Sequence, residues 1–168
     1  MHLASALLLP SSIRKVGGTH ALHAVCRLTF SANVGLGRTV KELMELPEMR
    51  QAHVVDKTRF SMWVPGVQEV VAKLGARSIV LCGIESHVCV QQTTLDLLAA
   101  GLNVHLVADA VSSRNAYDRK IALQRLRGDG AVLTTSESVI FELAGDAKSP
   151  NFKTVAALAK EEKQPWQQ

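Results

Sequence analysis

The sequence predicts an α/β protein, doubly wound, in which helices cover both faces of a parallel sheet. From residue 76 onward, short β-branched apolar runs alternate with amphipathic stretches of helix length. This alternation is typical of crossover units, which are right-handed and leave helices on both sides of the sheet. The 168 residues fit about one domain, and 47% hydrophobic residues with aromatics at 4% predict an aliphatic core.

The first predicted elements precede this regular region. Residues 20–30 (HALHAVCRLTF) and 52–57 (AHVVDK) are short apolar runs that we expect to form strands. The stretch 65–75 has a proline at its start and a glycine at its end, which is typical of a helix.

The central unit is a strand, a helix and a second strand. Residues 77–83 (RSIVLCG) predict a buried strand, and residues 88–101 predict a helix closed by Gly101. Residues 103–109 (NVHLVAD) predict the next strand of the same sheet.

An amphipathic helix is predicted for residues 116–130. Its pattern directs Ile121, Leu123 and Leu126 toward the sheet and its arginines and lysine outward.

The last predicted elements complete the alternation. Residues 131–136 predict a strand, residues 137–145 a helix capped by Ser136, and residues 151–162 a final helix. We expect residues 163–168 to be a flexible tail.

The charge pattern excludes some partners. The net charge is +4, and five Lys or Arg residues precede the first acidic residue, Glu42. A nucleic-acid surface needs clustered Lys and Arg interleaved with aromatics. Because the sequence has no such cluster, we expect a solvated basic surface and no nucleic-acid partner. No apolar run reaches the roughly 18 residues of a membrane span, so we expect no membrane partner.

The cysteines indicate the redox state of the cellular compartment. Cys26, Cys82 and Cys89 are too few and too irregularly spaced for a disulfide framework or a CxxC metal site, and indicate a reducing compartment. We expect a cytoplasmic, intracellular protein. A mitochondrial location is the alternative, because residues 1–15 lack acids and contain serines followed by two bases.

The chemistry is expected at the carboxyl ends of the strands, where ligands bind in open parallel sheets. Cys89 lies near the start of a predicted helix, where partial positive charge lowers a thiol pKa. Lys57 ends the 52–57 strand and can stabilise a thiolate or move a proton. The turn 83–87 (GIESH) exposes backbone N–H groups that can form an oxyanion hole.

Each of these residues also has a structural interpretation. A lone cysteine at this position can be a small packing residue, and a lone lysine after a strand can be a solvated surface residue. Asp109, which ends the 103–109 strand, can cap the following loop or contact a ligand.

Four segments resemble consecutive blocks of the isochorismatase-like cysteine hydrolases. They are VVDKTRFSMW, LCGIESHVCVQQTTLDLL, VHLVADAVSSRN and TTSESVIFELAGDAKSPNFK. Within that family they are most similar to isochorismatase domain-containing proteins 1 and 2. The similarity runs from about residue 35 to about residue 162, which predicts a divergent segment 1–34 before a domain at 35–162.

The resemblance implies a three-layer α/β/α fold and an Asp–Lys–Cys triad. Cys89 matches the nucleophile and Lys57 matches the lysine. The family pattern also implies a non-proline cis peptide between Ile84 and Glu85, which would direct the backbone N–H groups of Glu85 and Cys89 at an oxyanion.

The sequence departs from the family pattern at the triad aspartate. That residue belongs at the end of the first strand, whereas the first Asp of this chain is Asp56. Asp56 adjoins Lys57, so its side chain would point to the opposite face of the strand. The family's first strand is therefore expected to be missing, unless residues 4–10 (ASALLLP) or a partner chain fill its place.

No metal or other cofactor is expected. Some relatives carry a metal site in the loop after the second strand, but the corresponding residues 29–37 contain no His, Asp or Glu. His20 and His23 precede that loop. The stretch 35–39 (GLGRT) does not follow the dinucleotide-binding pattern.

Two functions follow from these features. The first is a hydrolase that acts on a small amide, carbamoyl or enol-ether substrate through Cys89 and Lys57. The second is a catalytically impaired or inactive member that acts as a binding or interaction protein, because the aspartate is absent. In either case we expect a homo-oligomer, since an exposed sheet edge favours association.

Overall fold

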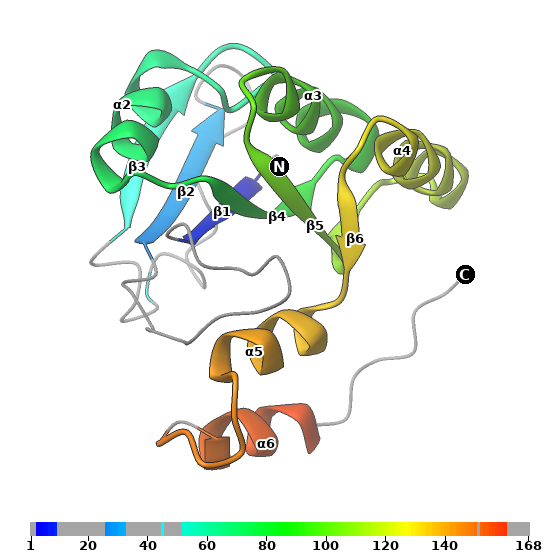
Figure 1. The fold of residues 1–168 in the computed structure, drawn as a ribbon. Coiled ribbons are helices and arrows are strands. Elements are labelled where there is room, and N and C mark those ends of the chain that lie inside the picture. Colours follow the sequence, from blue (N-terminus) through cyan, green and yellow to red (C-terminus); the bar gives the residue numbers. More distant parts are fainter. Residues whose placement is uncertain (1–2, 10–25, 33–44, 46–51, 151, 161–168) are drawn as a thin grey trace.

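The computed structural model describes residues 3–9, 26–32, 45, 52–150 and 152–160. One six-stranded sheet, in the order β3-β2-β1-β4-β5-β6, forms the centre of the fold (Figure 1). Its strands are β1 (Leu3–Leu9), β2 (Cys26–Ala32), β3 (His53–Lys57), β4 (Ser78–Ile84), β5 (Asn103–Ser112) and β6 (Val132–Thr134).

The helices follow the strands as the sequence predicts. They are α2 (Pro65–Leu74), the π-helical turn η2 (Ser86–Val90), α3 (Gln91–Ala99), α4 (Ala116–Gly128), α5 (Ser136–Ala144) and α6 (Phe152–Lys160). The predicted strand–helix alternation between residues 65 and 145 is confirmed, with boundaries shifted by a few residues. Gly75 ends α2 with a left-handed φ of 60°, a conformation that glycine adopts without steric cost. None of the described helices is long and apolar enough to cross a membrane.

Strand β1 fills the place where the family's first strand was expected to be missing, which is the exception that the sequence left open. The segment Leu3–Leu9 lies between β2 and β4 in the middle of the sheet. Residues 4–10 were named from the sequence as one possible replacement for the missing strand. It runs antiparallel to both neighbours, whereas β2–β3, β4–β5 and β5–β6 are parallel pairs. The sheet is therefore mixed: five strands share one direction and β1 opposes them.

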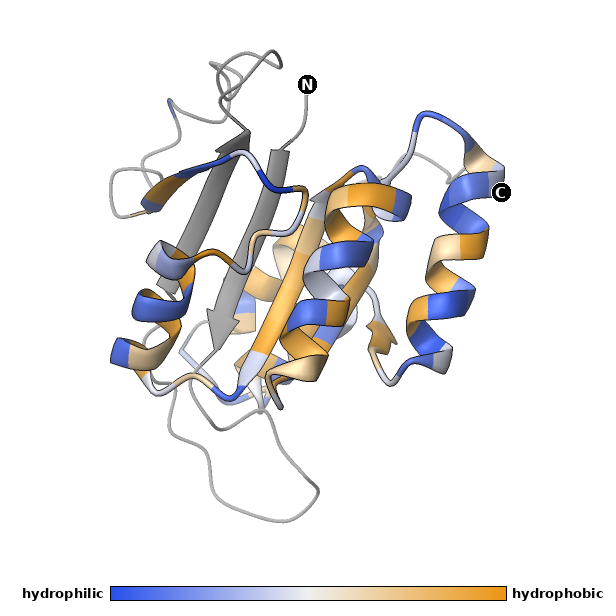
Figure 2. Cartoon of the chain, turned by 90° about the horizontal axis from the view of Figure 1, so that it is seen from above, coloured by the Kyte–Doolittle hydropathy of each residue, from blue (hydrophilic) through white to orange (hydrophobic). Residues whose placement is uncertain are grey.

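The core covers both faces of β4, as expected of a central strand. Ile79 and Leu81 belong to the larger core cluster, while Val80 belongs to a smaller cluster with Val107 and Val139. Figure 2 shows the coloured strands at the centre of the sheet as largely hydrophobic, with hydrophobic and hydrophilic residues alternating along the surrounding helices. Each aliphatic side chain fully buried in this way contributes about 1.5–3 kcal/mol.

Helix α4 packs on a different face from the predicted one. Ala122 and Leu126 are buried and Leu123 is partly buried, but Ile121 is 45% exposed. Arg119 is not directed outward: its Nε donates to the carbonyl oxygen of Val111 at 3.0 Å, and its Nη2 donates to that of Ala108. The pattern of apolar residues in α4 could not predict this buried face. The face is set partly by hydrogen bonds from Arg119 to main-chain carbonyl oxygens of β5, and the sequence of α4 does not reveal them.

The start of α5 also differs from the prediction. Thr135, and not Ser136, is the N-cap, and its hydroxyl accepts from the main-chain N–H of Ser138 at 3.2 Å. Ser136 donates instead to Asp109, from its N–H at 2.7 Å and from its hydroxyl at 2.6 Å. Asp109 therefore has a structural role, but a different one from the expected cap of the following loop: it fastens β5 to the start of α5.

Candidate active site

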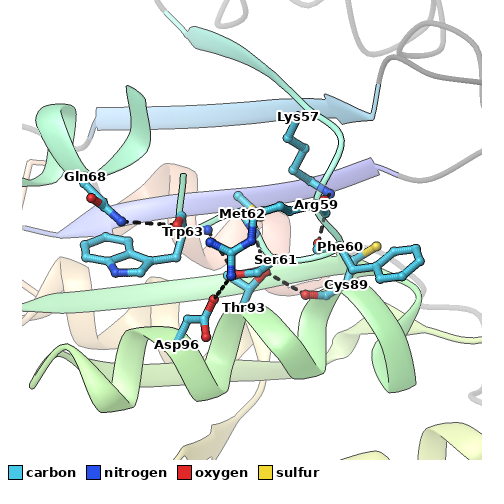
Figure 3. A network of polar contacts seen from close by, with 10 residues as sticks. All are labelled: Lys57, Arg59, Phe60, Ser61, Met62, Trp63, Gln68, Cys89, Thr93 and Asp96. Atoms are coloured by element: carbon cyan, nitrogen blue, oxygen red, sulfur yellow. Dashed lines mark hydrogen bonds and ion pairs between the residues drawn. The ribbon is translucent and has the colours of Figure 1, made fainter. Parts of the chain in front are cut away.

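Lys57 lies at the carboxyl end of β3 and is buried, with 6% of its surface exposed. Its neighbour Asp56 is exposed, as the alternation of side chains along a strand predicts. The Lys57 Nζ donates to the carbonyl oxygens of Arg59 and Phe60, each at 2.9 Å (Figure 3). The chain after β3 therefore folds back over its own lysine and holds the nitrogen in place.

The protonation of Lys57 is affected by this environment. Burial lowers the pKa of Lys57 below its ordinary value, because the charged ammonium is removed from water. The electrostatic interaction with Cys89 acts in the opposite direction and raises that pKa. Lys57 and Cys89 come from different strand–helix units, and both appear in the close-up around the loop after β3 (Figure 3).

Cys89 lies in η2, the π turn that joins β4 to α3, and is 2% exposed. The predicted helix start at residue 88 was wrong, since the chain already turns at Ser86. The side chain of Thr93 holds this turn: its Oγ1 donates to the Cys89 carbonyl oxygen at 2.6 Å. The Thr93 Oγ1 also accepts from the main-chain N–H of Met62 at 2.9 Å, which ties the loop after Lys57 to the turn that carries Cys89 (Figure 3).

The turn before Cys89 is fastened to the end of β5. The peptide bond between Ile84 and Glu85 is cis, at the position that the family resemblance implies. The Glu85 Oε2 accepts from the N–H of Arg114 at 2.9 Å, and the Ser86 hydroxyl donates to the carbonyl oxygen of Ser112 at 2.9 Å. The carboxylate of Glu85 thus has a main-chain partner in the segment after β5.

Further polar contacts support both sides of the site. His87 Nδ1 lies 3.0 Å from the Ser113 hydroxyl, and Arg59 forms an ion pair with Asp96 at 3.6 Å. These residues, together with Thr93, were not identified from the sequence. Only Thr93 offered a signal, because a threonine four residues after Cys89 in a helix can donate back to its carbonyl oxygen.

The other cysteines differ from Cys89. Burial raises the pKa of the Cys82 thiol to about 11, so this thiol stays protonated near neutral pH. The side chain of Cys26 lies outside the described residues, as do His20, His23 and the stretch 35–39. Among the residues that the structure does describe, no group of three His, Cys, Asp or Glu side chains could hold a metal ion.

The arrangement offers a thiol, an amine and a turn rich in backbone N–H groups at one edge of the sheet. These are the parts of a nucleophilic acyl-transfer site. A carboxylate beside the thiol is the part that β1 does not bring, because Leu3–Leu9 contains neither Asp nor Glu.

Comparisons with known proteins agree on one family. The family model of the isochorismatase domain matches residues 18–138. Isochorismatase domain-containing protein 1 of Salmo salar is 50% identical over 127 residues, which are 75% of this chain and 44% of that protein. Isochorismatase domain-containing protein 2 of Bos taurus is 51% identical over 135 residues, which are 80% of this chain and 64% of that protein. The chain thus spans about half to two thirds of these relatives.

Solved structures show the same fold. The MAR1 ribonuclease from Caenorhabditis elegans aligns with a TM-score of 0.70 at 39% identity, covering 84% of this chain and 75% of that one. YcaC from Pseudomonas aeruginosa, solved with hexane-2,5-diol and covalent acrylamide, aligns with a TM-score of 0.64 at 27% identity. The latter alignment covers 74% of this chain and 66% of YcaC.

Proposed function

The chain belongs to the isochorismatase domain family, and on this premise we propose that it is a hydrolase with Cys89 as its nucleophile. Its substrate would be a small molecule with an amide, carbamoyl or enol-ether group. The observation that carries the proposal is the burial of Lys57 and Cys89 at the carboxyl edge of the sheet, where Thr93 joins the loop after Lys57 to the turn that carries Cys89.

For an amide or carbamoyl substrate, the Cys89 thiolate would attack the carbonyl carbon. The backbone N–H groups of Glu85 and Cys89 would hold the oxyanion that forms. The C–N bond would then break, with the leaving nitrogen taking the proton that the thiol gave up, and water would release the acid from the thioester and restore the thiol. The bonds from the Glu85 and Ser86 side chains to the region after β5 would keep this turn rigid during the reaction.

The covalent acrylamide in the structure of YcaC supports the use of an electrophile as the first probe. We would follow alkylation of Cys26, Cys82 and Cys89 by acrylamide with mass spectrometry between about pH 4 and pH 10. We expect Cys89 to react fastest of the three thiols. Cys82 should react only toward the alkaline end, because its pKa is raised to about 11.

Turnover needs a separate measurement. Ammonia release from a panel of small primary amides and carbamoyl compounds would test the main proposal, and release of the cleaved product from a vinyl ether would test the enol-ether class. An RNA cleavage assay belongs beside them, because the Caenorhabditis elegans relative is described as a ribonuclease.

The second candidate is an impaired or inactive member that binds a ligand or partner. It is favoured by one observation, the absence of an acid in the central strand β1. Equal reactivity of Cys82 and Cys89, or a reactive Cys89 without turnover on any substrate class, would support this candidate over the hydrolase.

A further inference from the structure

We propose that Arg119 of α4 is a positioning residue for the reaction. It holds the end of β5 in place, and through that strand end it holds the turn that presents the backbone N–H of Glu85. The inference rests on the hydrolase function proposed above, in which this N–H binds the oxyanion.

Strand β5 departs from regular pairing with β4 shortly before the site. Leu81 of β4 pairs with Leu106 of β5, and the next pair in the register is Gly83 with Val111. Residues 107–110 therefore form a bulge opposite a single residue of β4. Because a bulge interrupts the ladder of main-chain hydrogen bonds, the carbonyl oxygens of the bulged strand need other partners.

Arg119 supplies such partners inside the bulge and just after it. Its Nη2 donates to the carbonyl oxygen of Ala108, and its Nε donates to that of Val111 at 3.0 Å. The donors of a guanidinium lie in a rigid planar fork, so a single side chain fixes the relative positions of two carbonyl oxygens. Arg119 thus fastens β5 to α4 where the ladder to β4 is interrupted.

The residues that follow Val111 hold the turn of the candidate site. The Ser112 carbonyl oxygen accepts from the Ser86 hydroxyl, and the Arg114 N–H donates to the Glu85 carboxylate, each at 2.9 Å. Since both bonds start from the backbone directly after Val111, the position of Val111 sets the position of the turn. Helix α4 also packs against η2, which begins in this turn.

Cys89 has a separate support. Its carbonyl oxygen accepts from the Thr93 hydroxyl on α3, at 2.6 Å. The nucleophile is therefore held by α3, whereas the turn before it is held by the end of β5 and by Arg119. Loss of the Arg119 side chain should displace the Glu85 N–H more than the Cys89 sulfur.

Turnover and alkylation distinguish these two groups. Arg119→Met should lower kcat on the amide that the wild type hydrolyses best by about 10²-fold, the scale of a misplacement of about 1 Å away from the chemistry. KM should change little, because the oxyanion forms only on the way through the transition state. Iodoacetamide loses iodide from a saturated carbon and develops no oxyanion, so its reaction with Cys89 should stay close to the wild-type rate. A merely structural role would lower both rates together.

Hydrogen–deuterium exchange measures the positioning without a substrate. In Arg119→Met, peptides that cover residues 83–88 and 107–114 should exchange faster than in the wild type. Peptides that cover α2 should exchange at the wild-type rate, because α2 lies on strands that Arg119 does not hold. A rise spread evenly over the whole chain would mean a general loss of stability and would contradict the local role.

Arg125 provides the matched control. It lies on the same helix with a side chain that is 55% exposed, and it pairs with Asp129 at 3.4 Å, so Arg125→Met should change none of these measurements. Arg119→Lys keeps the charge and serves if the methionine variant does not fold. A lysine donates from one nitrogen and has no planar fork, so this variant should lose part of kcat and keep the alkylation rate.

Three results would overturn the role of Arg119 and leave the hydrolase standing. They are a wild-type kcat in Arg119→Met, an equal loss of turnover and alkylation in the Arg119 variants, and unchanged exchange at residues 83–88. A wild-type chain without turnover on any substrate class removes both proposals.

Discussion

Strands β4 and β1 are neighbours in the middle of the sheet, yet they contribute differently to the candidate site. The chain leaves β4 at the edge where the turn to Cys89 begins. β1 runs the other way, so its first residues lie at that edge, with Ala4 opposite Gly83 in the register. One strand delivers its carboxyl end to the site and the other does not.

The difference separates two requirements of a central strand. Main-chain hydrogen bonds can be satisfied by a parallel or an antiparallel neighbour, so a reversed segment can fill a gap in the sheet. Side-chain chemistry at the strand end depends on direction, because reversal exchanges the residues at the two edges. The comparison can be tested from the side of β4 and from the side of β1.

The largest effect is expected on the β4 side, from Cys89→Ser. Removal of the nucleophile should lower turnover by up to about 10⁶-fold, the scale seen when a nucleophile is removed from a catalytic unit. Steady-state kinetics on the best amide substrate would measure it. Cys82→Ser is the control and should keep turnover within a few-fold, since Cys82 belongs to β4 itself and not to the turn. Full activity of Cys89→Ser would refute its role as nucleophile.

On the β1 side, Ala6→Pro tests whether the reversed strand holds the sheet together. Ala6 is paired with Leu28 on one side and Leu81 on the other, and proline removes a ladder donor and strains the strand. We expect the free energy of unfolding to fall by about 3 kcal/mol or more. Urea unfolding would measure it, with Ala6→Ser as a control that keeps the N–H. Equal stability of the two variants would mean that β1 does not pair centrally in solution.

A smaller effect on the β4 side is expected from Thr93→Val. The substitution removes the donor to the Cys89 carbonyl oxygen and leaves the buried N–H of Met62 without its acceptor. An unsatisfied buried group costs about 1–3 kcal/mol, so both the unfolding free energy and the rate of Cys89 alkylation should fall.

Thr94→Val is the matched control for this prediction. It removes one bond, from the Thr94 hydroxyl to the Val90 carbonyl oxygen at 2.8 Å, and leaves the loop after Lys57 attached. A larger loss of alkylation in Thr94→Val than in Thr93→Val would contradict the role given to Thr93.

Much of the fold between residues 65 and 145 could be predicted, because it depends on local patterns. Proline and glycine at the ends of α2, and short apolar runs in β4 and β5, report the backbone conformation directly. The buried face of α4 could not be predicted in the same way. It depends on which residues of β5 lie opposite, and there Arg119 replaces Ile121 as an inward-facing side chain.

The candidate site also has a part that could be predicted from the sequence and a part that could not. Lys57 and Cys89 could be named from the sequence, with the help of the family resemblance. The bonds that hold them could not, since Lys57 is fixed by carbonyl oxygens and Cys89 by Thr93, and a carbonyl oxygen has no sequence signature.

The sequence by itself determined the strand–helix alternation, the residues able to do chemistry and the absence of an acid before Glu42. The tertiary structure decided the direction of β1 and the burial of Lys57 and Cys89. The physical reason is the range of the interactions. Propensity and periodicity act within a few residues, whereas strand direction and desolvation depend on groups that are distant in the chain and meet only in the folded protein.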